Sequence, residues 1–223
     1  MRPTNSTPQK DYLDSVLKGK EPWESQARQA AEVLKLEAIS LDKSEASFLK
    51  WCVQTAKAKN AVEIGTLTGL SGLYILSGLL PGGTLWTLEK NPLHAQPALK
   101  ILSAYAHQQE KKVEVLVGDA RQTLVSLETS GPFDFIFIDG NKAAYGDYLL
   151  WAEKNLKPGG YLVADNVFLS GAVAENSVTA SGQKFSAKQI EVMRKFNDRL
   201  VHSDFWRACF VPTQEGLIVA QKN

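Results

Sequence analysis

The sequence has little cysteine, no long apolar run and almost no net charge, and each shortage excludes a class of protein. Cys52 and Cys209 are the only cysteines among 223 residues, which is too few for a disulfide framework, and no Cys and His spacing matches a zinc site. No run approaches the roughly 18 apolar residues of a membrane helix. The formal net charge is +1, so bulk electrostatics do not favour nucleic acid as a partner.

The N-terminal segment "MRPTNSTPQKDYLDSVLKGK" is polar and lacks the apolar centre of a secretory signal peptide. Together with the shortage of cysteine, this predicts a soluble cytoplasmic protein. Hydrophobic residues make up 44% and charged residues 22% of the chain, which is typical of a globular protein. The length suits a single domain over residues 1–223.

Two regions with different patterns follow one another in this predicted domain. Residues 1–59 show only helical spacing, with helices predicted in "ESQARQAAEVLKLEA" and "SEASFLKWCVQTAKA". Ser44 is a possible start of the second helix, without the Glu or Gln three residues later that completes a capping box. In residues 60–223, short runs rich in Val, Ile, Leu and aromatic residues alternate with helix-like segments, namely "AVEIG", "GTLWTLE", "VEVLVGD", "FDFIFID" and "GYLVADN".

The end of the chain has a different order of elements. Residues 169–184 are rich in Ser, Ala and Gly and are interpreted as a mobile surface loop, followed by a helix in "AKQIEVMRKFNDRLV". Two last strand-like runs, "FWRACFVP" and "EGLIVAQK", predict an antiparallel hairpin. The predicted fold class is therefore α/β, with a Rossmann-like doubly wound, mostly parallel sheet of seven strands, this hairpin and extra N-terminal helices.

Acidic residues close strand after strand in this pattern. In a doubly wound sheet, ligands bind outside the carboxyl ends of the strands, so these positions are candidates for a site. In the turn "VEIGTLTGLSG", Gly65 and Gly69 let the backbone approach a ligand closely, although such turns are also merely structural. The spacing matches neither G-x-G-x-x-G nor a P-loop. Glu63 favours an amine or a ribose over a phosphate at this turn.

The next two strand ends fit the rest of a nucleoside. Glu89 lies 20 residues after Gly69 (89 − 69), the offset at which an acid binds ribose hydroxyls, though it could instead neighbour a helix cap. Asp119 and Ala120 could lie beside an adenine, and "GDARQTL" reads equally well as a helix capped by Asp119.

Three oxygen-bearing side chains end the last two parallel strands. Two nearby carboxylates repel unless a cation lies between them, so Asp139, Asp165 and Asn166 predict a Mg²⁺, Mn²⁺ or Ca²⁺ site. The alternative is that Asp139 caps a helix and "ADN" forms an Asx turn. Lys142 would have a lowered pKa near a metal ion and could act as a general base, or it could simply be solvated.

With these residues in hand, the chain resembles the cation-dependent O-methyltransferases that include the caffeoyl-CoA and catechol O-methyltransferases, especially the small bacterial members. The resemblance runs through "AVEIGTLTGLSG", "TLEKNP", "GDA", "FDFIFIDGNKAAYGDYL", "LKPGGYLVADNVFLSGAV" and "VPTQEGLIVAQK". It implies methyl transfer from S-adenosylmethionine to one hydroxyl of a vicinal aromatic diol that chelates a divalent cation. It also implies a homodimer.

The resemblance also implies residue roles. Asp139, Asp165 and Asn166 match the metal ligands, and Lys142, with Asp139 beside it, matches the catalytic base. The cofactor contacts would be Glu63, Gly65, Thr66, Ser71, Glu89, Asp119, Ala120 and Asp139. Asn141 departs from the family, because relatives commonly have an acid there, and Ala46 and Ser47 replace a usual Gly-Gln.

Other functions remain open at this point. A metal-independent methyltransferase with another small acceptor is the main alternative, and a nucleotide-binding dehydrogenase or a silent binding module fits the motifs less well. We expect acceptor choice to depend on the N-terminal helices, on residues 169–184 and on the turn at residues 212–215. No residue pattern identifies the acceptor itself.

Overall fold

Five parallel strands form the centre of the sheet in the computed structural model, which describes residues 8–17, 23–36, 39–213 and 215–223. Two antiparallel strands extend the sheet beyond β5, giving the order β3-β2-β1-β4-β5-β9-β8. This confirms the predicted fold class. The strands are β1 (Asn60–Ile64), β2 (Thr84–Glu89), β3 (Lys112–Val117), β4 (Phe133–Ile138), β5 (Leu156–Asp165), β8 (Trp206–Val211) and β9 (Leu217–Lys222).

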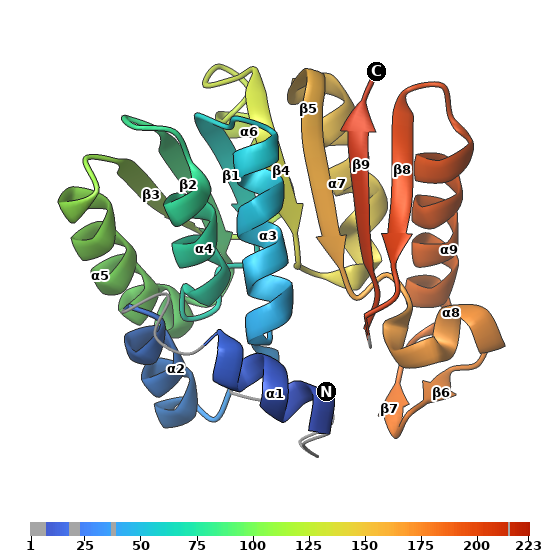
Figure 1. Cartoon of the computed structure of the whole chain (residues 1–223). Coiled ribbons are helices and arrows are strands. Elements are labelled where there is room, and N and C mark those ends of the chain that lie inside the picture. The colour runs from blue at the N-terminus through green and yellow to red at the C-terminus, as the bar shows by residue number, and fades with distance from the viewer. Residues whose placement is uncertain (1–7, 18–22, 37–38, 214) are drawn as a thin grey trace.

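Helices cover both faces of the sheet, which explains why its central strands are apolar on both sides (Figure 1). All six residues of β4 are buried. Phe135 and Phe137 join the apolar cluster under α3 (Lys43–Thr55), α4 (Leu70–Gly78) and α5 (Pro92–Gln108). Ile136 and Ile138 join the cluster under α6 (Ala120–Ser126), α7 (Tyr145–Asn155) and α9 (Ala187–His202).

The N-terminal region contains α1 (Pro8–Val16) and α2 (Glu24–Val33) before α3. The predicted start of α3 at Ser44 is wrong by two residues. Asp42 is the N-cap, and its carboxylate accepts a hydrogen bond from the backbone N–H of Glu45 in a complete capping box. The division of a single domain at residues 59 and 60 stays a prediction.

Residues 169–184, interpreted from the sequence as a mobile surface loop, contain several short elements of secondary structure. This segment forms η3 (Leu169–Gly171), α8 (Ala172–Glu175) and a small hairpin of β6 (Thr179–Ala180) and β7 (Gln183–Lys184). Ser and Gly in this segment support left-handed backbone at Ser170, Gly171, Ser181 and Gly182. The left-handed conformation of these four residues lets a short segment fold back on itself.

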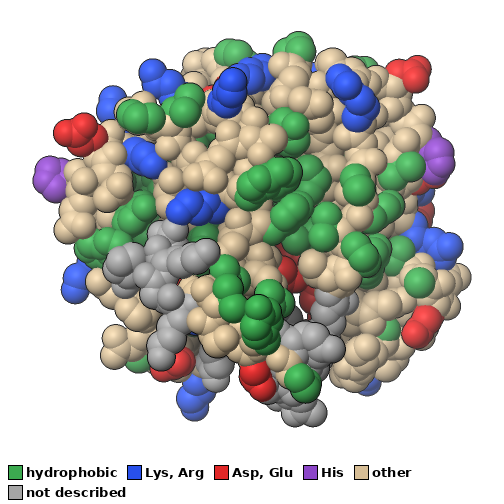
Figure 2. Space-filling model, viewed as in Figure 1, with side chains coloured by type: hydrophobic (Ala, Val, Ile, Leu, Met, Phe, Trp, Pro, Cys, Tyr) green, Lys and Arg blue, Asp and Glu red, His purple; other side chains and the backbone are tan. Residues whose placement is uncertain are grey.

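The additional elements gather at one end of the sheet. Figure 1 shows α1, α2, α8 and the β6–β7 hairpin at the end to which the arrowheads of β4 and β5 point. The space-filling view from the same side has a hollow near its middle, with acidic atoms recessed inside it (Figure 2). No helix in the described part of the chain is long and apolar enough to cross a membrane.

Gly65 locks the carboxyl ends of β1 and β4 against each other. The backbone N–H of Asp139 donates to the carbonyl of Ile64 at 2.8 Å, and Gly65 adopts a φ of +105°. A Cβ atom at Gly65 would lie 2.1 Å from the backbone oxygen of Asp139. Only glycine fits this position, because the atom in the way is backbone and cannot rotate aside.

We therefore expect Gly65→Ala to lower the free energy of unfolding by at least about 2 kcal/mol more than Gly82→Ala does. Gly82 is the matched control, because its φ is also positive, at +70°, but a Cβ atom there would have no other atom within 4 Å. Urea unfolding of both variants measures the difference. Equal losses would show that backbone conformation alone, and not the contact with Asp139, makes glycine necessary.

Candidate active site

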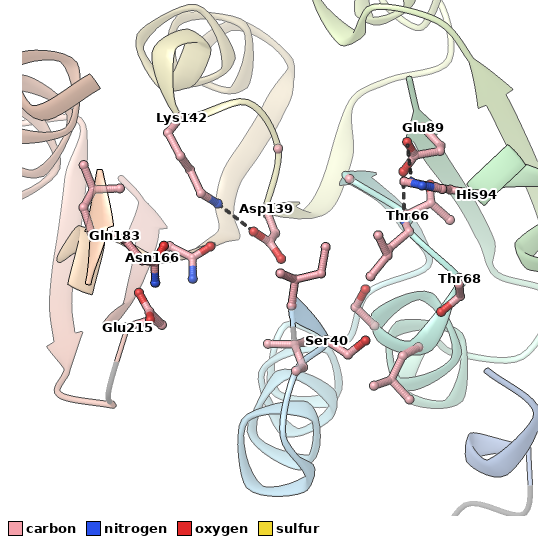
Figure 3. A pocket seen from close by; sticks show the side chains of 18 of the residues that line it. Ser40, Thr66, Thr68, Glu89, His94, Asp139, Lys142, Asn166, Gln183 and Glu215 are labelled. Carbon is pink, nitrogen blue, oxygen red and sulfur yellow. Dashed lines mark hydrogen bonds and ion pairs between the residues drawn. The ribbon is translucent and has the colours of Figure 1, made fainter. Parts of the chain in front are cut away.

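A cavity of about 330 Å³ opens at the carboxyl ends of the strands. Figure 3 shows Asp139 between two groups of side chains, with Thr66, Glu89 and His94 on one side and Asn166, Gln183 and Glu215 on the other. The cavity is lined by Ile39, Ser40, Leu41, Gly65, Thr66, Leu67, Thr68, Leu70, Ser71, Glu89, His94, Asp139, Gly140, Lys142, Asn166, Leu169, Gln183, Phe185 and Glu215.

Glu63 lies beneath the turn between β1 and α4 and is completely buried. The hydroxyl of Thr87 donates its proton to the carboxyl group of Glu63. Thr87 therefore accepts in its hydrogen bond with the hydroxyl of Thr66, which lies 2.5 Å away and is the donor. Burial raises the pKa of Glu63 to about 8, and the charges of Asp139 and Glu89 add to this, while hydrogen bonds from Ser71 and Thr87 oppose it. Glu63 therefore holds a proton near neutral pH.

Glu89 ends β2 and is 8% exposed. Its carboxylate accepts the backbone N–H of Leu67 at 2.9 Å and that of Asn91 at 2.8 Å, which joins the β1–α4 turn to the start of α5. His94 lies 3.8 Å from the same carboxylate. Glu89 thus neighbours the helix cap at Asn91, which is the alternative interpretation, and it also lines the cavity.

Asp119 and Ala120 do not line the cavity. Asp119 is the N-cap of α6, and its carboxylate accepts the backbone N–H of Arg121 and pairs with the guanidinium of the same residue. The hydrogen bond from the Arg121 side chain lowers the pKa of Asp119 to about 2. The helix-cap interpretation is therefore confirmed, and an adenine contact at these two residues stays a prediction.

Lys142 points back at the end of β4 from the short helix η2 (Lys142–Ala144). Its Nζ donates to Asp139 Oδ1 at 2.7 Å and to the hydroxyl of Tyr145 at 3.0 Å. That hydroxyl, fully buried, donates to the backbone carbonyl of Asp165 at 2.8 Å. Tyr145 thus connects the lysine to the ends of β4 and β5.

The charge state of Lys142 depends on the carboxyl groups around it. Burial opposes its charged form, but the carboxylates of Asp139 and Asp165, with Tyr145, outweigh burial and raise the pKa of Lys142 above its usual range. In this arrangement the ammonium supplies the positive charge that the carboxylates require. The lowered pKa predicted for Lys142 beside a metal ion stays a prediction.

Asp165 and Asn166 end β5, and only Asn166 lines the cavity. Asp165 is fully buried, and its Oδ1 accepts the backbone N–H of the next residue, Asn166, at 2.6 Å, whereas the Asx turn considered as the alternative uses the N–H two residues on. Asn166 has a φ of +58°, and its side chain faces Asp139 across the cavity (Figure 3). Asp139 and Asn166 therefore line one cavity at neighbouring strand ends, and a joint role of these two residues and Asp165 as metal ligands stays a prediction.

These side chains suit a divalent cation in their chemistry. Asp139 and Asp165 already share one positive charge, and Asn166 adds an amide oxygen of the kind that hard cations accept. No group of three or more His, Cys, Asp and Glu side chains is placed to hold a metal ion anywhere in the described ranges. A cation site here thus requires the amide of Asn166 as its third protein donor.

Several residues at the site were not singled out from the sequence. Ser40 lies in a bend before α3, Thr68 in the turn after β1, and His94 in the first turns of α5. Gln183 and Glu215 belong to segments expected to set acceptor choice, but neither was named individually. Asn141 caps η2 by accepting the N–H of Ala143, and it does not line the cavity, so its missing charge does not alter the wall of the cavity.

The fold is that of an α/β protein with a doubly wound sheet, and the cavity lies at the carboxyl ends of the strands, where sheets of this kind bind nucleoside-bearing cofactors. Residues 18–223 match the family model described as O-methyltransferase, and the chain belongs to this family. The resemblance and the enzyme class inferred from the sequence are thereby confirmed.

Relatives agree over most of their length. A catechol O-methyltransferase from Niastella koreensis is 36% identical over 165 residues, covering 73% of this chain and 71% of the relative. An O-methyltransferase from Bacillus cereus in complex with SAH has a TM-score of 0.86 at 29% identity, covering 97% of this chain and 98% of that one. The O-methyltransferase TomG from Streptomyces achromogenes in complex with SAM has a TM-score of 0.85 at 27% identity, covering 96% of each chain.

The proton on Glu63 should make stability depend on pH. The folded protein holds this proton up to about pH 8, whereas an unfolded glutamate releases it near pH 4.3, so stability falls as pH rises between these values. We expect this group alone to lower the free energy of unfolding by roughly 3 kcal/mol from pH 5 to pH 8.

Glu63→Gln should remove that part of the slope, as measured by urea unfolding at several pH values in this window. Glu191→Gln is the control, since Glu191 lies on the surface of α9 and pairs only with Lys195. It should keep the slope of the wild type. A Glu63→Gln slope equal to that of the wild type would contradict a proton on Glu63.

Proposed function

We propose that the protein transfers a methyl group from S-adenosylmethionine to one hydroxyl of a vicinal aromatic diol, with a divalent cation as cofactor. The proposal rests on one observation: Asp139, Lys142 and Asn166 line the same cavity as the turn after β1. Relatives named catechol O-methyltransferase support the acceptor class. The solved relatives with SAH and SAM support the methyl donor.

The end of the cavity near β1 and β2 would hold the donor. Glu89 presents a carboxylate that suits ribose hydroxyls, and Glu63, with Thr66 and Ser71 above it, suits a cationic amine. An approaching amine would favour the charged form of Glu63 and thereby release its proton. When bound, S-adenosylmethionine supplies a methyl group on a positively charged sulfur.

Asp139, Asp165 and Asn166 would hold the cation. A divalent ion at this point supplies stabilisation of negative charge on the diol oxygens. The protein's part is to fix these side chains at the rigid ends of β4 and β5, with Tyr145 joining the two strand ends. Rigid positioning of this kind lowers the entropy cost of bringing the reacting groups together.

Lys142 is the proposed proton acceptor for the diol hydroxyl. Its Nζ lies in the wall of the cavity beside Asp139, and Tyr145 holds it in this place. Because it carries a proton in the present arrangement, Lys142 can act as a base only after the charge of the neighbouring carboxylates is compensated in another way. The proposal therefore links its role as a base to the presence of the cation.

The ion pair between Lys142 and Asp139 also favours a second candidate, a methyltransferase that needs no metal ion. If the ammonium is the permanent partner of both carboxylates, no further cation is required. The two candidates share the donor and the reaction and differ in their response to a chelator. The homodimer and the cytoplasmic location stay predictions.

We expect methyl transfer from labelled S-adenosylmethionine to 4-methylcatechol to stop when EDTA is added and to return with excess Mg²⁺. Radioactivity in the methylated product is the measurement. 4-Methylphenol is the control acceptor, since it lacks the second hydroxyl, and it should not be methylated. Unchanged turnover of the catechol in EDTA would favour the metal-independent candidate.

Asn166→Ala should weaken Mg²⁺ binding at least about tenfold and lower kcat/KM about 100-fold, because one protein donor is lost. Titration calorimetry with Mg²⁺ measures the first effect and the methyl-transfer assay the second. Binding of S-adenosylmethionine should persist. Asn197→Ala is the control, since Asn197 donates to the carbonyl of Val167 from α9 and lies outside the cavity lining. Full Mg²⁺ affinity in Asn166→Ala would remove Asn166 from the site.

A further inference from the structure

Glu215 is a buried carboxylate in the wall of the cavity, and the proposed reaction does not use it. It is 5% exposed and directly precedes the turn into β9. Figure 3 places it with Gln183 and Asn166, on the opposite side of Asp139 from Glu89 and His94. If the donor occupies the side of Glu89, Glu215 faces the part of the acceptor beyond its two hydroxyls.

The hydrogen bonds of Glu215 leave acceptor capacity unused. The backbone N–H of Ser170 donates to Oε2 at 3.2 Å, and the Ser170 hydroxyl lies 3.0 Å from Oε1 and 2.9 Å from Oε2. A hydroxyl has one proton, so Ser170 supplies two protons to a carboxylate that can accept about four. Gln183 Nε2 donates to the oxygen of Ser170 at 2.9 Å, which orients the serine proton toward Glu215.

Glu215 has no partner of opposite charge among the residues that the structure describes. No Lys, Arg or His in these ranges forms an ion pair with it. Figure 3 shows the amides of Gln183 and Asn166 on the same side of the cavity, and the apolar side chains of Leu169 and Phe185 also belong to its wall. An uncompensated carboxylate in such surroundings exerts its charge on whatever enters the cavity.

The backbone holds Glu215 in this position. Its carbonyl accepts the N–H of Phe168 at 3.0 Å, and the carbonyl of Gly216 accepts the N–H of Val167 at 3.1 Å. Gly216 has a φ of +78°, and a Cβ there would lie 2.5 Å from the ring of Phe168. The turn is therefore closely packed, and two backbone hydrogen bonds hold Glu215 beside Ser170.

We propose that Glu215 determines acceptor specificity, so that the enzyme prefers aromatic diols whose ring bears a cationic amine over diols whose ring bears a carboxylate. The inference rests on the proposed function, since it concerns the acceptor of that reaction. An amine provides the hydrogen-bond donors and the positive charge that Glu215 lacks, whereas a carboxylate meets a like charge. Glu215 is thus a selecting residue, distinct from the residues that hold the reacting oxygens.

The test compares kcat/KM for three catechols whose ring bears a two-carbon substituent with a positive charge, no charge or a negative charge: 4-(2-aminoethyl)catechol, 4-ethylcatechol and 3,4-dihydroxyphenylacetate. The wild type should prefer the amine to the carboxylate by at least about tenfold. Glu215→Gln keeps the shape and removes the charge, so the preference should fall about tenfold, mainly through KM. The rate with uncharged 4-ethylcatechol should change less than about threefold.

Two further variants separate charge from structure. Glu215→Asp keeps the charge and should keep the preference. Glu175→Gln removes a negative charge from α8, which lies in residues 169–184 together with Ser170. Glu175 does not line the cavity, so this variant should behave as the wild type. Calorimetric titration of the protein, loaded with S-adenosylhomocysteine and Mg²⁺, with the amine and the carboxylate should show the same preference without turnover.

The outcomes distinguish this inference from the proposed function. Turnover of 4-ethylcatechol with no preference between the charged acceptors would overturn the role of Glu215 and leave the proposed function standing. A uniform loss for all three acceptors in Glu215→Gln would show that Glu215 only anchors Ser170. Absence of turnover with every diol would overturn both.

Discussion

The confinement of several carboxyl groups at one end of the sheet is the constraint on which the rest of the site depends. Glu63 and Asp165 are fully buried, Glu89 is 8% exposed, and Asp139 lies between them at the end of the neighbouring strand. Like charges this close raise the free energy of the folded state unless each is neutralised or hydrogen-bonded. The structure meets this demand in a different way at each position.

Glu63 takes up a proton, because burial disfavours its charged form and the hydrogen bonds from Ser71 and Thr87 do not outweigh this effect. Glu89 accepts two backbone N–H groups, which stabilise an anion without a cation. Asp139 and Asp165 share the ammonium of Lys142. The cavity therefore has one region of hydrogen-bonded acids and another region where positive charge is required. In the proposed reaction the first region would hold the methyl donor and the second the cation.

The sequence predicted the sheet and most of the site because both depend on local patterns. Apolar runs such as Phe133–Ile138 are buried on both faces, so their composition alone identifies them as central strands. Strand ends then bring Glu89, Asp139 and Asn166 together by topology. The order of the strands is the only tertiary information that this step needs.

What the sequence did not predict depends on contacts between distant segments. The charge of Lys142 depends first on Asp139 and then also on Tyr145 and on Asp165, which is 23 residues away (165 − 142) and on the next strand. The structure of residues 169–184 depends on Glu215, whose carboxylate holds Ser170 from the far end of the chain. The capping box at Asp42 is local and could have been predicted, since Glu45 follows it by three residues.

The position of the cavity follows from the order in which the strands are added. From β1 the chain adds β2 and β3 on one side, then returns to place β4 and β5 on the other. The helix after β1 therefore covers one face of the sheet, and the helix after β4 covers the opposite face. The loops that follow β1 and β4 consequently lead in opposite directions and leave space between them at the ends of these two strands. Gly65 and Asp139 lie directly after these two strands, in contact through their backbones. Because Lys142 stands on the loop that leaves toward the other face, its ammonium reaches back to Asp139 at the end of β4, and both side chains line the cavity.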